Sequence, residues 1–229
     1  MTDRYGVTAL RTVVVMDYQN VHLTGHGMFK VSRHRPKHEA LVDPLNFANQ
    51  LIRTRNQLQR PGMDHALLSR VLVYRGQPSP EHDPKAYARN QAQKSRWERD
   101  PRVAVHLRPL KYRYRRDDTG GLVLDFSGRR IVEERLEKGV DVLCALALVR
   151  EAQNPDIDLV ILASHDSDVE PALDEAIARN TAKIETFCWF DQVQPWLSQQ
   201  LRPGSGRRVW NTRLGETEFR NCWDLTSYS

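Results

Sequence analysis

Thr12-Val-Val-Val-Met-Asp-Tyr-Gln-Asn20 is the stretch that decides the fold, because an apolar run leads straight into a carboxylate at Asp17. Short runs that are apolar on both faces are typical of central strands in a parallel sheet. A second run, Leu159-Val-Ile-Leu-Ala163, leads in the same way into Ser164-His-Asp-Ser-Asp168. Ligands of open parallel sheets bind beyond the carboxyl ends of the strands, where the strand order reverses. We therefore expect the acids after the two runs to meet at one edge of a sheet.

The rest of the chain predicts strands alternating with helices. Helices are expected at 41–58, 84–97, 133–152 and 169–179, and strands at 66–74, 103–114, 122–126, 157–163 and 182–190. The strands at 103–114 and 122–126 would form a small β-hairpin insertion. This alternation predicts a doubly wound α/β fold. We assign 1–194 to one domain and expect 195–229 to be an irregular, partly ordered appendage, because periodicity fades after Pro195.

Composition excludes several classes of protein. The 229 residues are 40% hydrophobic and 28% charged, too apolar for a disordered chain and too polar for a membrane protein. No run approaches the roughly 18 apolar residues of a transmembrane helix. The three cysteines lack the spacing of a zinc site or a disulfide framework. The cytoplasm is the expected compartment.

Charge is distributed unevenly along the chain. The net charge is +5, but residues 1–120 hold 22 Lys and Arg against 11 Asp and Glu, whereas residues 121–229 hold 12 against 18. A basic half favours a polyanionic partner, and an acidic half that is not a tail favours clustered carboxylates. A solvated surface with segregated charge is the alternative.

Asp141 interrupts the apolar segment Val140-Asp-Val-Leu-Cys-Ala-Leu-Ala-Leu-Val149. We expect this helix to be buried over most of its surface, so the carboxylate must be paired, hydrogen-bonded or bound to metal. An ion pair with Arg135 is the structural alternative. Glu137 and Lys138 lie four and three residues earlier, on the same predicted helical face. Glu137 is thus a candidate additional carboxylate, and Lys138 a candidate phosphate ligand or charge balance.

Four aspartates are candidates for one acidic site. Strand ends and a helix start would bring together Asp17, Asp141, Asp166 and Asp168. Such a cluster repels itself without cations, and hard oxygen ligands suit Mg²⁺ or Mn²⁺. Two such ions activate water and stabilise an in-line phosphoryl displacement. Taken singly, Asp166 and Asp168 are also explained as caps of the next helix.

Two basic segments are candidates for binding nucleic acid. In Lys111-Tyr-Arg-Tyr-Arg115, strand alternation puts Tyr112 and Tyr114 on one face for stacking, and Lys111, Arg113 and Arg115 on the other for phosphates. A charged edge strand protected from aggregation is the alternative. Residues 26–38 are also basic and would border the pocket or form a solvated loop. Single-stranded RNA is the expected partner, although charge does not distinguish RNA from DNA.

Three motifs resemble the NYN branch of the PIN-like nucleases across about residues 12–190. They are Asp17-x-x-Asn20, Lys138-Gly-Val-Asp141 and Ser164-x-Asp-Ser-Asp168. The resemblance implies a three-layer α/β/α sandwich with a central parallel sheet and an Mg²⁺ or Mn²⁺ site that cuts RNA. It also implies that the four aspartates bind the metal, that Asn20 orients Asp17 or contacts substrate, and that Ser164 supports the last loop.

His165 stands where the family pattern usually has glycine. We expect its side chain to point to the surface; a proton shuttle at the site is the other interpretation. The expected activity is that of a metal-dependent endoribonuclease. A catalytically inactive RNA-binding or adaptor module is the alternative, and His165 is the irregularity that motivates it. The sequence leaves the oligomeric state open, a homo-oligomer included.

Overall fold

The computed structural model describes residues 9–30, 40–179 and 181–228. Six strands form a parallel sheet in the order β4-β3-β1-β7-β8-β9. They are β1 (Ala9–Asp17), β3 (His65–Gln77), β4 (Val103–Pro109), β7 (Leu159–Ala163), β8 (Lys183–Trp189) and β9 (Trp210–Leu214). Two small antiparallel sheets pair β2 (Leu41–Val42) with β10 (Trp223–Asp224) and β5 (Lys111–Tyr114) with β6 (Val132–Leu136).

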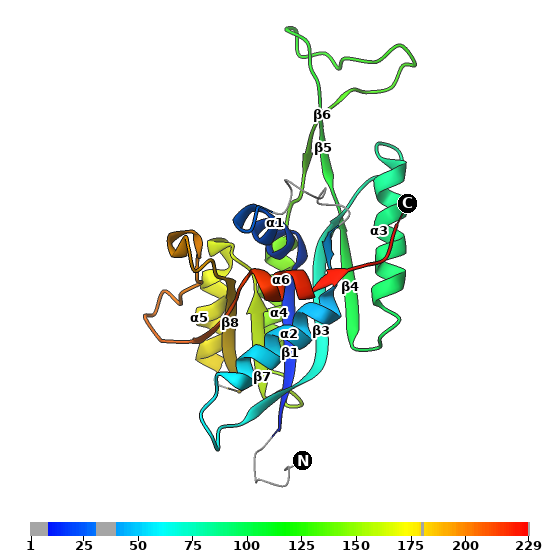
Figure 1. Cartoon of the computed structure of the whole chain (residues 1–229). Coiled ribbons are helices and arrows are strands. Elements are labelled where there is room, and N and C mark those ends of the chain that lie inside the picture. The colour runs from blue at the N-terminus through cyan, green and yellow to red at the C-terminus, as the bar shows by residue number, and fades with distance from the viewer. Residues whose placement is uncertain (1–8, 31–39, 180, 229) are drawn as a thin grey trace.

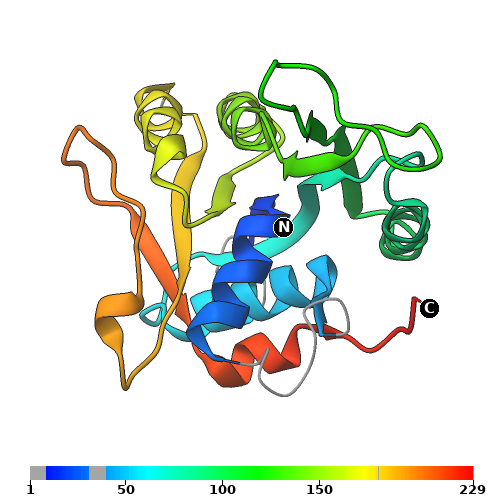
Figure 2. The ribbon, with the colours of Figure 1, turned by 90° about the horizontal axis from the view of Figure 1, so that it is seen from above.

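Helices cover both faces of the sheet, which makes the three-layer α/β/α sandwich that was expected. Figure 2 shows α4 and α5 over one face and α1, α2 and α6 over the other. The helices are α1 (Tyr18–Met28), α2 (Pro44–Gln57), α3 (Pro84–Trp97), α4 (Val140–Ala152), α5 (Glu170–Arg179) and α6 (Glu216–Asn221), with short 3₁₀ helices at Ser167–Val169 and Pro195–Leu197. Each helix in the described part of the chain is too short or too polar to span a bilayer.

The apolar run of β1 is buried on both sides of the sheet, as its sequence predicts. Val14 and Met16 belong to the core under α1, α2 and α6, while Val13 and Val15 belong to the core under α4 and α5. All four side chains are fully buried. β1 pairs with β3 on one side and with β7 on the other, so the strand order reverses between β1 and β7. This switch point is where an open parallel sheet binds its ligands.

The insertion is an arm, residues 111–136, that projects from the edge of the sheet formed by the carboxyl ends of the parallel strands (Figure 1). The expected pairing of 103–114 with 122–126 is wrong. Residues 103–109 form an edge strand of the main sheet, and β5 pairs with β6. Residues 122–126 pair instead with the residues just after β5, where Leu122 bridges Arg116 and Val123 N donates to Arg115 O at 3.0 Å. β6 reads Val132-Glu-Glu-Arg-Leu136, and its three charged residues give no strand signal.

The helix expected over 133–152 begins only at Val140. Residues 132–136 form β6 instead, and Gly139 has a φ of 77° at the helix start. A residue with a side chain rarely adopts that φ, so Gly139 separates strand from helix. The helix is also less buried than expected, because Val142 and Leu146 are 54% and 62% exposed.

The C-terminal segment is part of the domain and not an irregular appendage. β9 extends the sheet beside β8, and α6 follows it directly. Leu201, Leu214 and Phe219 are fully buried. The strand escaped prediction because it lies at the edge of the sheet, where polar and charged residues are tolerated; it reads Trp210-Asn-Thr-Arg-Leu214.

Candidate acidic site at the strand switch point

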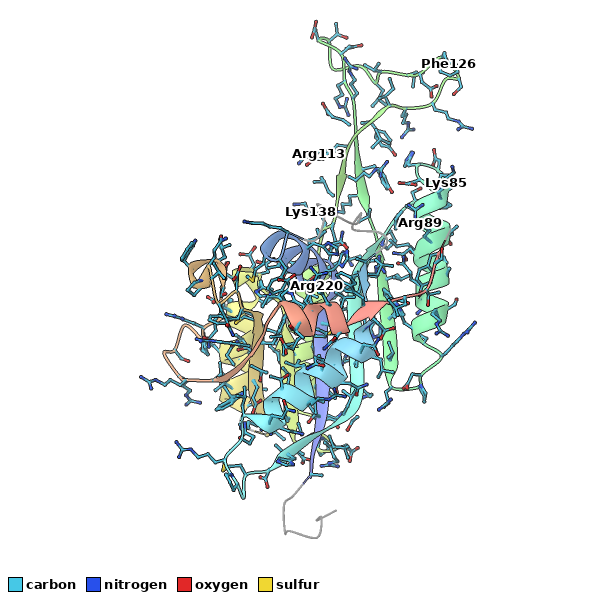
Figure 3. The ribbon with its side chains drawn as sticks, in the orientation of Figure 1. Lys85, Arg89, Arg113, Phe126, Lys138 and Arg220 are labelled. Carbon is cyan, nitrogen blue, oxygen red and sulfur yellow. The ribbon has the colours of Figure 1, made fainter. Side chains whose placement is uncertain are left out.

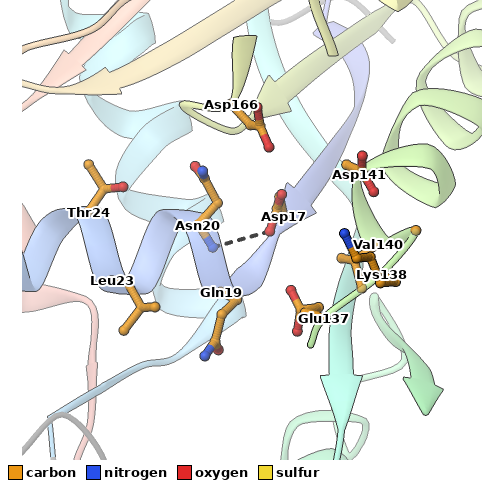
Figure 4. Close-up of a pocket in the computed structure, with 11 residues that line it drawn as sticks. Asp17, Gln19, Asn20, Leu23, Thr24, Glu137, Lys138, Val140, Asp141 and Asp166 are labelled. Carbon is orange, nitrogen blue, oxygen red and sulfur yellow. Dashed lines mark hydrogen bonds between the residues drawn. The ribbon is translucent and has the colours of Figure 1, made fainter. Parts of the chain in front are cut away.

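A pocket of about 380 Å³ lies at the switch point between β1 and β7 (Figure 4). The end of β1, the start of α1, the β6–α4 connection and the loop after β7 contribute to its wall. Among the described residues, four carboxylates and one lysine line it. The described lining is Asp17, Gln19, Asn20, Leu23, Thr24, Glu137, Lys138, Gly139, Val140, Asp141 and Asp166.

Asp17 ends β1 and caps α1. Its Oδ1 accepts a 3.2 Å hydrogen bond from Asn20 N, and the residue is 5% exposed. Burial above all, followed by the charges of Glu137, Asp166 and Asp141, raises the pKa of Asp17 to about 7, although the bond from Asn20 lowers it. Like charges around a buried carboxyl disfavour its ionised form. A cation would reverse that balance.

Asp166 lies on the loop after β7, and two side chains hold that loop. Asp166 N donates to Ser164 Oγ at 3.1 Å, so the fully buried Ser164 makes the supporting contact that was expected of it. Asn20 Oδ1 accepts a 2.6 Å hydrogen bond from His165 N. Asp166 Oδ1 in turn accepts from Asp168 N at 3.0 Å and caps the short 3₁₀ helix.

Capping and pocket lining coincide at Asp17 and Asp166. In both residues the capping bond uses Oδ1. Among the described residues, neither Oδ2 has a hydrogen-bond donor assigned to it. The capping interpretation is therefore correct for Asp166, and it leaves one oxygen of each carboxylate available to a ligand.

Asp141 occupies the first turn of α4 and is half-buried. The alternative ion pair with Arg135 is absent, because Arg135 Nη1 binds Asp83 Oδ2 at 2.8 Å. No cation of the described chain lies within ion-pairing distance of Asp141. Figure 4 shows its carboxylate directed toward the same space as those of Asp17 and Asp166.

Glu137 reaches the pocket from the turn after β6, and not from a helical face as was expected. Its Oε2 accepts a 2.6 Å hydrogen bond from Gly76 N at the end of β3. A Cβ on Gly76 would clash with Glu137 Oε2 and would lie 2.5 Å from Leu110 Cδ2. Burial, and then the charge of Asp141, raise the pKa of Glu137. A side chain at position 76 would therefore push the end of the Glu137 side chain aside.

The donor set suits a hard divalent cation, but the carboxylates do not form a closed cage. Within residues 9–30, 40–179 and 181–228, no group of three or more His, Cys, Asp or Glu side chains has the geometry to hold a metal ion. Mg²⁺ usually keeps several waters and is held through one or two carboxylates together with substrate phosphates. The oxygen-only chemistry therefore fits Mg²⁺ or Mn²⁺ without a closed cage.

Two residues of the last motif lie away from the pocket. Asp168 is exposed and is absent from the lining. His165 is 6% exposed, so the expected surface orientation is wrong. Its Nδ1 lies 3.2 Å from Gln199 O, its Nε2 accepts a 3.4 Å hydrogen bond from Trp189 N, and burial lowers its pKa to about 4. His165 therefore packs the loop against β8 and the C-terminal segment, and it does not reach the pocket.

The basic strand of the arm shows the expected alternation, but its tyrosines contact the protein itself and are not exposed for stacking on bases. Lys111 and Arg113 are exposed, whereas Tyr112 and Tyr114 are half-buried. Tyr112 Oη accepts from Ser79 N at 2.7 Å, and Tyr114 Oη lies 3.0 Å from His82 Nε2. The tyrosines thus anchor the arm to the β3–α3 loop. Arg113 pairs with Glu134, which leaves Lys111 and Arg115 as the cations of this strand without an ion pair in the described chain.

The second basic segment falls largely outside the described residues, which omit 31–39 and with them Arg33, Arg35 and Lys37. Its first residue, His26, belongs to α1 and is fully buried, with Nε2 2.8 Å from Ala40 O. Sequence reasoning also missed that α1 supplies pocket residues besides Asn20, namely Gln19, Leu23 and Thr24. Leu23 and Thr24 lie one helical turn beyond Gln19 and Asn20. A helix that starts directly after Asp17 therefore places all four residues on one face, and this spacing could have predicted their place in the pocket wall.

Comparisons with known proteins identify no relative of known function. The sequence matches no protein family profile and no curated protein. A solved structure that the chain matches is a protein of unknown function from Vibrio parahaemolyticus RIMD 2210633, with a TM-score of 0.38 and 19% sequence identity over 82% of this chain and 84% of that one. A similarity at this level says nothing about activity.

Proposed function

We propose that the protein is a divalent-metal-dependent ribonuclease that hydrolyses RNA phosphodiester bonds at the acidic pocket. The observation that carries the proposal is the convergence of Asp17, Asp141 and Asp166, from three separate segments, on one pocket at the switch point. No cation of the described chain pairs with any of the three. Buried or half-buried carboxylates without such partners are costly unless a cation joins them.

The residues divide into recognisable roles. Asp17, Asp141 and Asp166 would hold Mg²⁺ or Mn²⁺, and Glu137 is the candidate further carboxylate. The ion would supply Lewis-acid activation of water and neutralise charge on the scissile phosphate. Lys138, the lysine in the pocket lining, would attract the phosphate, and Asn20 would keep the Asp166 loop in place through His165 N.

A cleavage assay tests the proposal. Wild-type protein is incubated with labelled single-stranded RNA, duplex RNA and DNA in Mg²⁺, Mn²⁺ or EDTA. We expect metal-dependent cleavage of RNA that falls about 100-fold or more in Asp17→Asn and Asp166→Asn, since even residues that only support metal ligands change activity 10- to 100-fold. Asp168→Asn is the matched control and retains activity, because Asp168 does not line the pocket. Cleavage that survives in the first two variants contradicts the proposal.

A non-cleaving RNA-binding module is the second candidate. The observation that favours it is the lack, among the described residues, of three carboxylates in metal-holding geometry. The buried position of His165 removes the earlier argument for it, because that side chain does not intrude on the pocket. RNA binding of equal affinity in wild type and Asp17→Asn, without turnover in any divalent ion, would favour this candidate over the nuclease.

A further inference from the structure

A second pocket, of about 460 Å³, adjoins the acidic one and has the opposite character. The two pockets share Gln19, Leu23 and Glu137. Three arginines line the second pocket, from the end of β3, from α3 and from β6. The described residues of its lining are Tyr18, Gln19, His22, Leu23, Leu41, Arg75, Gly76, Pro78, Ala86, Arg89, Asn90, Gln93, Leu110, Arg135 and Glu137.

Arg75 brings a largely buried cation to this pocket, and the charge of Glu137 in the same lining offsets it in part. Its guanidinium carbon lies 4.5 Å from the centroid of the Tyr18 ring, and its Nη1 donates to Gln93 Oε1 at 2.8 Å. Arg75 Nε is buried and has no hydrogen-bond partner in the described chain. No carboxylate of the described chain lies within 4 Å of the guanidinium. An anion in the pocket would supply the missing acceptor.

Asn90 brings an unsatisfied acceptor to the same wall. The residue is 3% exposed, and its Nδ2 donates to Gly76 O at 3.2 Å. Its Oδ1 is buried and has no partner among the described residues. A buried acceptor without a donor carries its full desolvation penalty. A ligand that offers an N–H or O–H group would remove that penalty.

Arg89 is the accessible cation of the pocket. It is half-buried on α3, and the structure assigns it no ion pair within the described ranges. Figure 3 shows Arg89 and Lys85 on α3 at the end of the molecule that also carries Lys138. Arg135, by contrast, is held by Asp83. Leu23, Leu41, Pro78 and Leu110 add apolar surface.

We propose that this second pocket is a nucleotide subsite, which binds one nucleotide of an RNA strand whose adjoining phosphate enters the acidic pocket. Arg75 and Arg89 bind the phosphate group of that nucleotide, and Asn90 Oδ1 accepts from its base or ribose. The apolar residues contact the base. The link to cleavage rests on the proposed function, whereas binding of the nucleotide does not require it.

The test measures binding without metal, on the full-length protein in EDTA. Calorimetric titrations use adenosine 5′-monophosphate, uridine 5′-monophosphate, adenosine and inorganic phosphate as separate probes. At least one monophosphate should bind with a Kd of about 1 mM or tighter, and more tightly than phosphate or adenosine alone. Arg89→Ala should weaken that binding about tenfold or more, because a charge-assisted contact is lost. Lys85→Ala, four residues earlier on α3 and outside the lining, should change it less than twofold.

Three results would overturn the subsite: no nucleotide binding, equal binding of phosphate and nucleotide, or equal weakening in the two variants. The cleavage assay separates this inference from the proposed function. Binding that depends on Arg89 without cleavage retains the subsite and removes the nuclease. Cleavage without nucleotide binding retains the nuclease and removes the subsite. If both hold, Arg89→Ala raises KM for RNA more than it lowers kcat.

Discussion

Asn20 Oδ1 accepts a 2.6 Å hydrogen bond from His165 N, across 145 residues of sequence. This bond joins the first turn of α1 to the loop after β7. It therefore links the segments that follow β1 and β7 at the switch point. The backbone N–H of the same Asn20 donates to Asp17 Oδ1. One residue therefore contacts the carboxylate at the end of β1 and the loop that carries Asp166.

Asn20→Ala should destabilise the protein and reduce cleavage together. The substitution leaves His165 N without its acceptor, which costs about 1–3 kcal/mol in the free energy of unfolding. Urea unfolding measures this cost. Gln19→Ala is the control: Gln19 lines the pocket but has no side-chain hydrogen bond assigned in the described chain, and we expect a change within about 0.5 kcal/mol. Equal stability of the two variants would contradict the role given to Asn20.

Gly76→Ala should displace Glu137. The added Cβ would clash with Glu137 Oε2 and would lie 2.5 Å from Leu110 Cδ2, and overpacking of this kind costs about 1–3 kcal/mol in unfolding free energy. Thermal and urea unfolding test this. Gly27→Ala, on α1, has no atom within 4 Å of its Cβ and should leave stability unchanged or raise it by up to about 1 kcal/mol. If Gly76→Ala is as stable as Gly27→Ala, the close contact between residue 76 and Glu137 is absent in solution, and the prediction is contradicted.

Protonation of His165 should destabilise the fold in mildly acidic solution. Its pKa is about 4 in the folded protein and 6.5 in the unfolded chain, because burial disfavours the charged ring. Between these values the unfolded chain binds more protons, so this contribution is complete above pH 6.5 and is lost as pH falls toward 4, up to about 3 kcal/mol. The raised pKa of Asp17 acts in the opposite direction over the same range, so the difference between wild type and His165→Gln measures the contribution of His165. Urea unfolding of both proteins in EDTA from pH 7 to 4 gives that difference. The stability of wild type relative to His165→Gln should fall as pH falls; the same pH dependence in both proteins would rule the effect out.

The exposed cations of the arm should strengthen RNA binding through phosphate contacts. Replacing Lys111 and Arg115 together with alanine should reduce the slope of log K against log salt by about 1.4, since each contact with a single strand contributes about 0.7. The control pair, Arg207→Ala and Arg208→Ala, removes the same charge from an exposed segment outside the arm and should leave the slope unchanged. Fluorescence anisotropy with labelled single-stranded RNA gives the slopes. Equal slopes for both double variants would contradict a binding role for the arm.

The part of the fold that the sequence predicted is the part determined by local pattern. The runs ending at Asp17 and Ala163 are apolar on both faces because both faces of the sheet are covered, and both are central strands. Their following acids meet because parallel strands end at the same edge of a sheet. The three-layer architecture follows from the same alternation of strands and helices.

The parts that escaped prediction depend on contacts between distant segments. Glu137 enters the pocket because Gly76 N, 61 residues away, binds its carboxylate. His165 is buried by Trp189 and by the backbone of Gln199, neither of which its own motif specifies. β9 also depends on a distant segment, because it pairs with β8 at the edge of the sheet, where its polar sequence is tolerated.

The most direct test of the central claim, that Asp17, Asp141 and Asp166 share a divalent cation, is a titration with Mn²⁺ followed by electron paramagnetic resonance. The wild-type protein should bind Mn²⁺ in competition with Mg²⁺, and Asp168→Asn should bind it equally well. Asp17→Asn and Asp141→Asn should each lose that binding by about tenfold or more. Binding of the same strength in all four proteins, or none in the wild type, would contradict the claim.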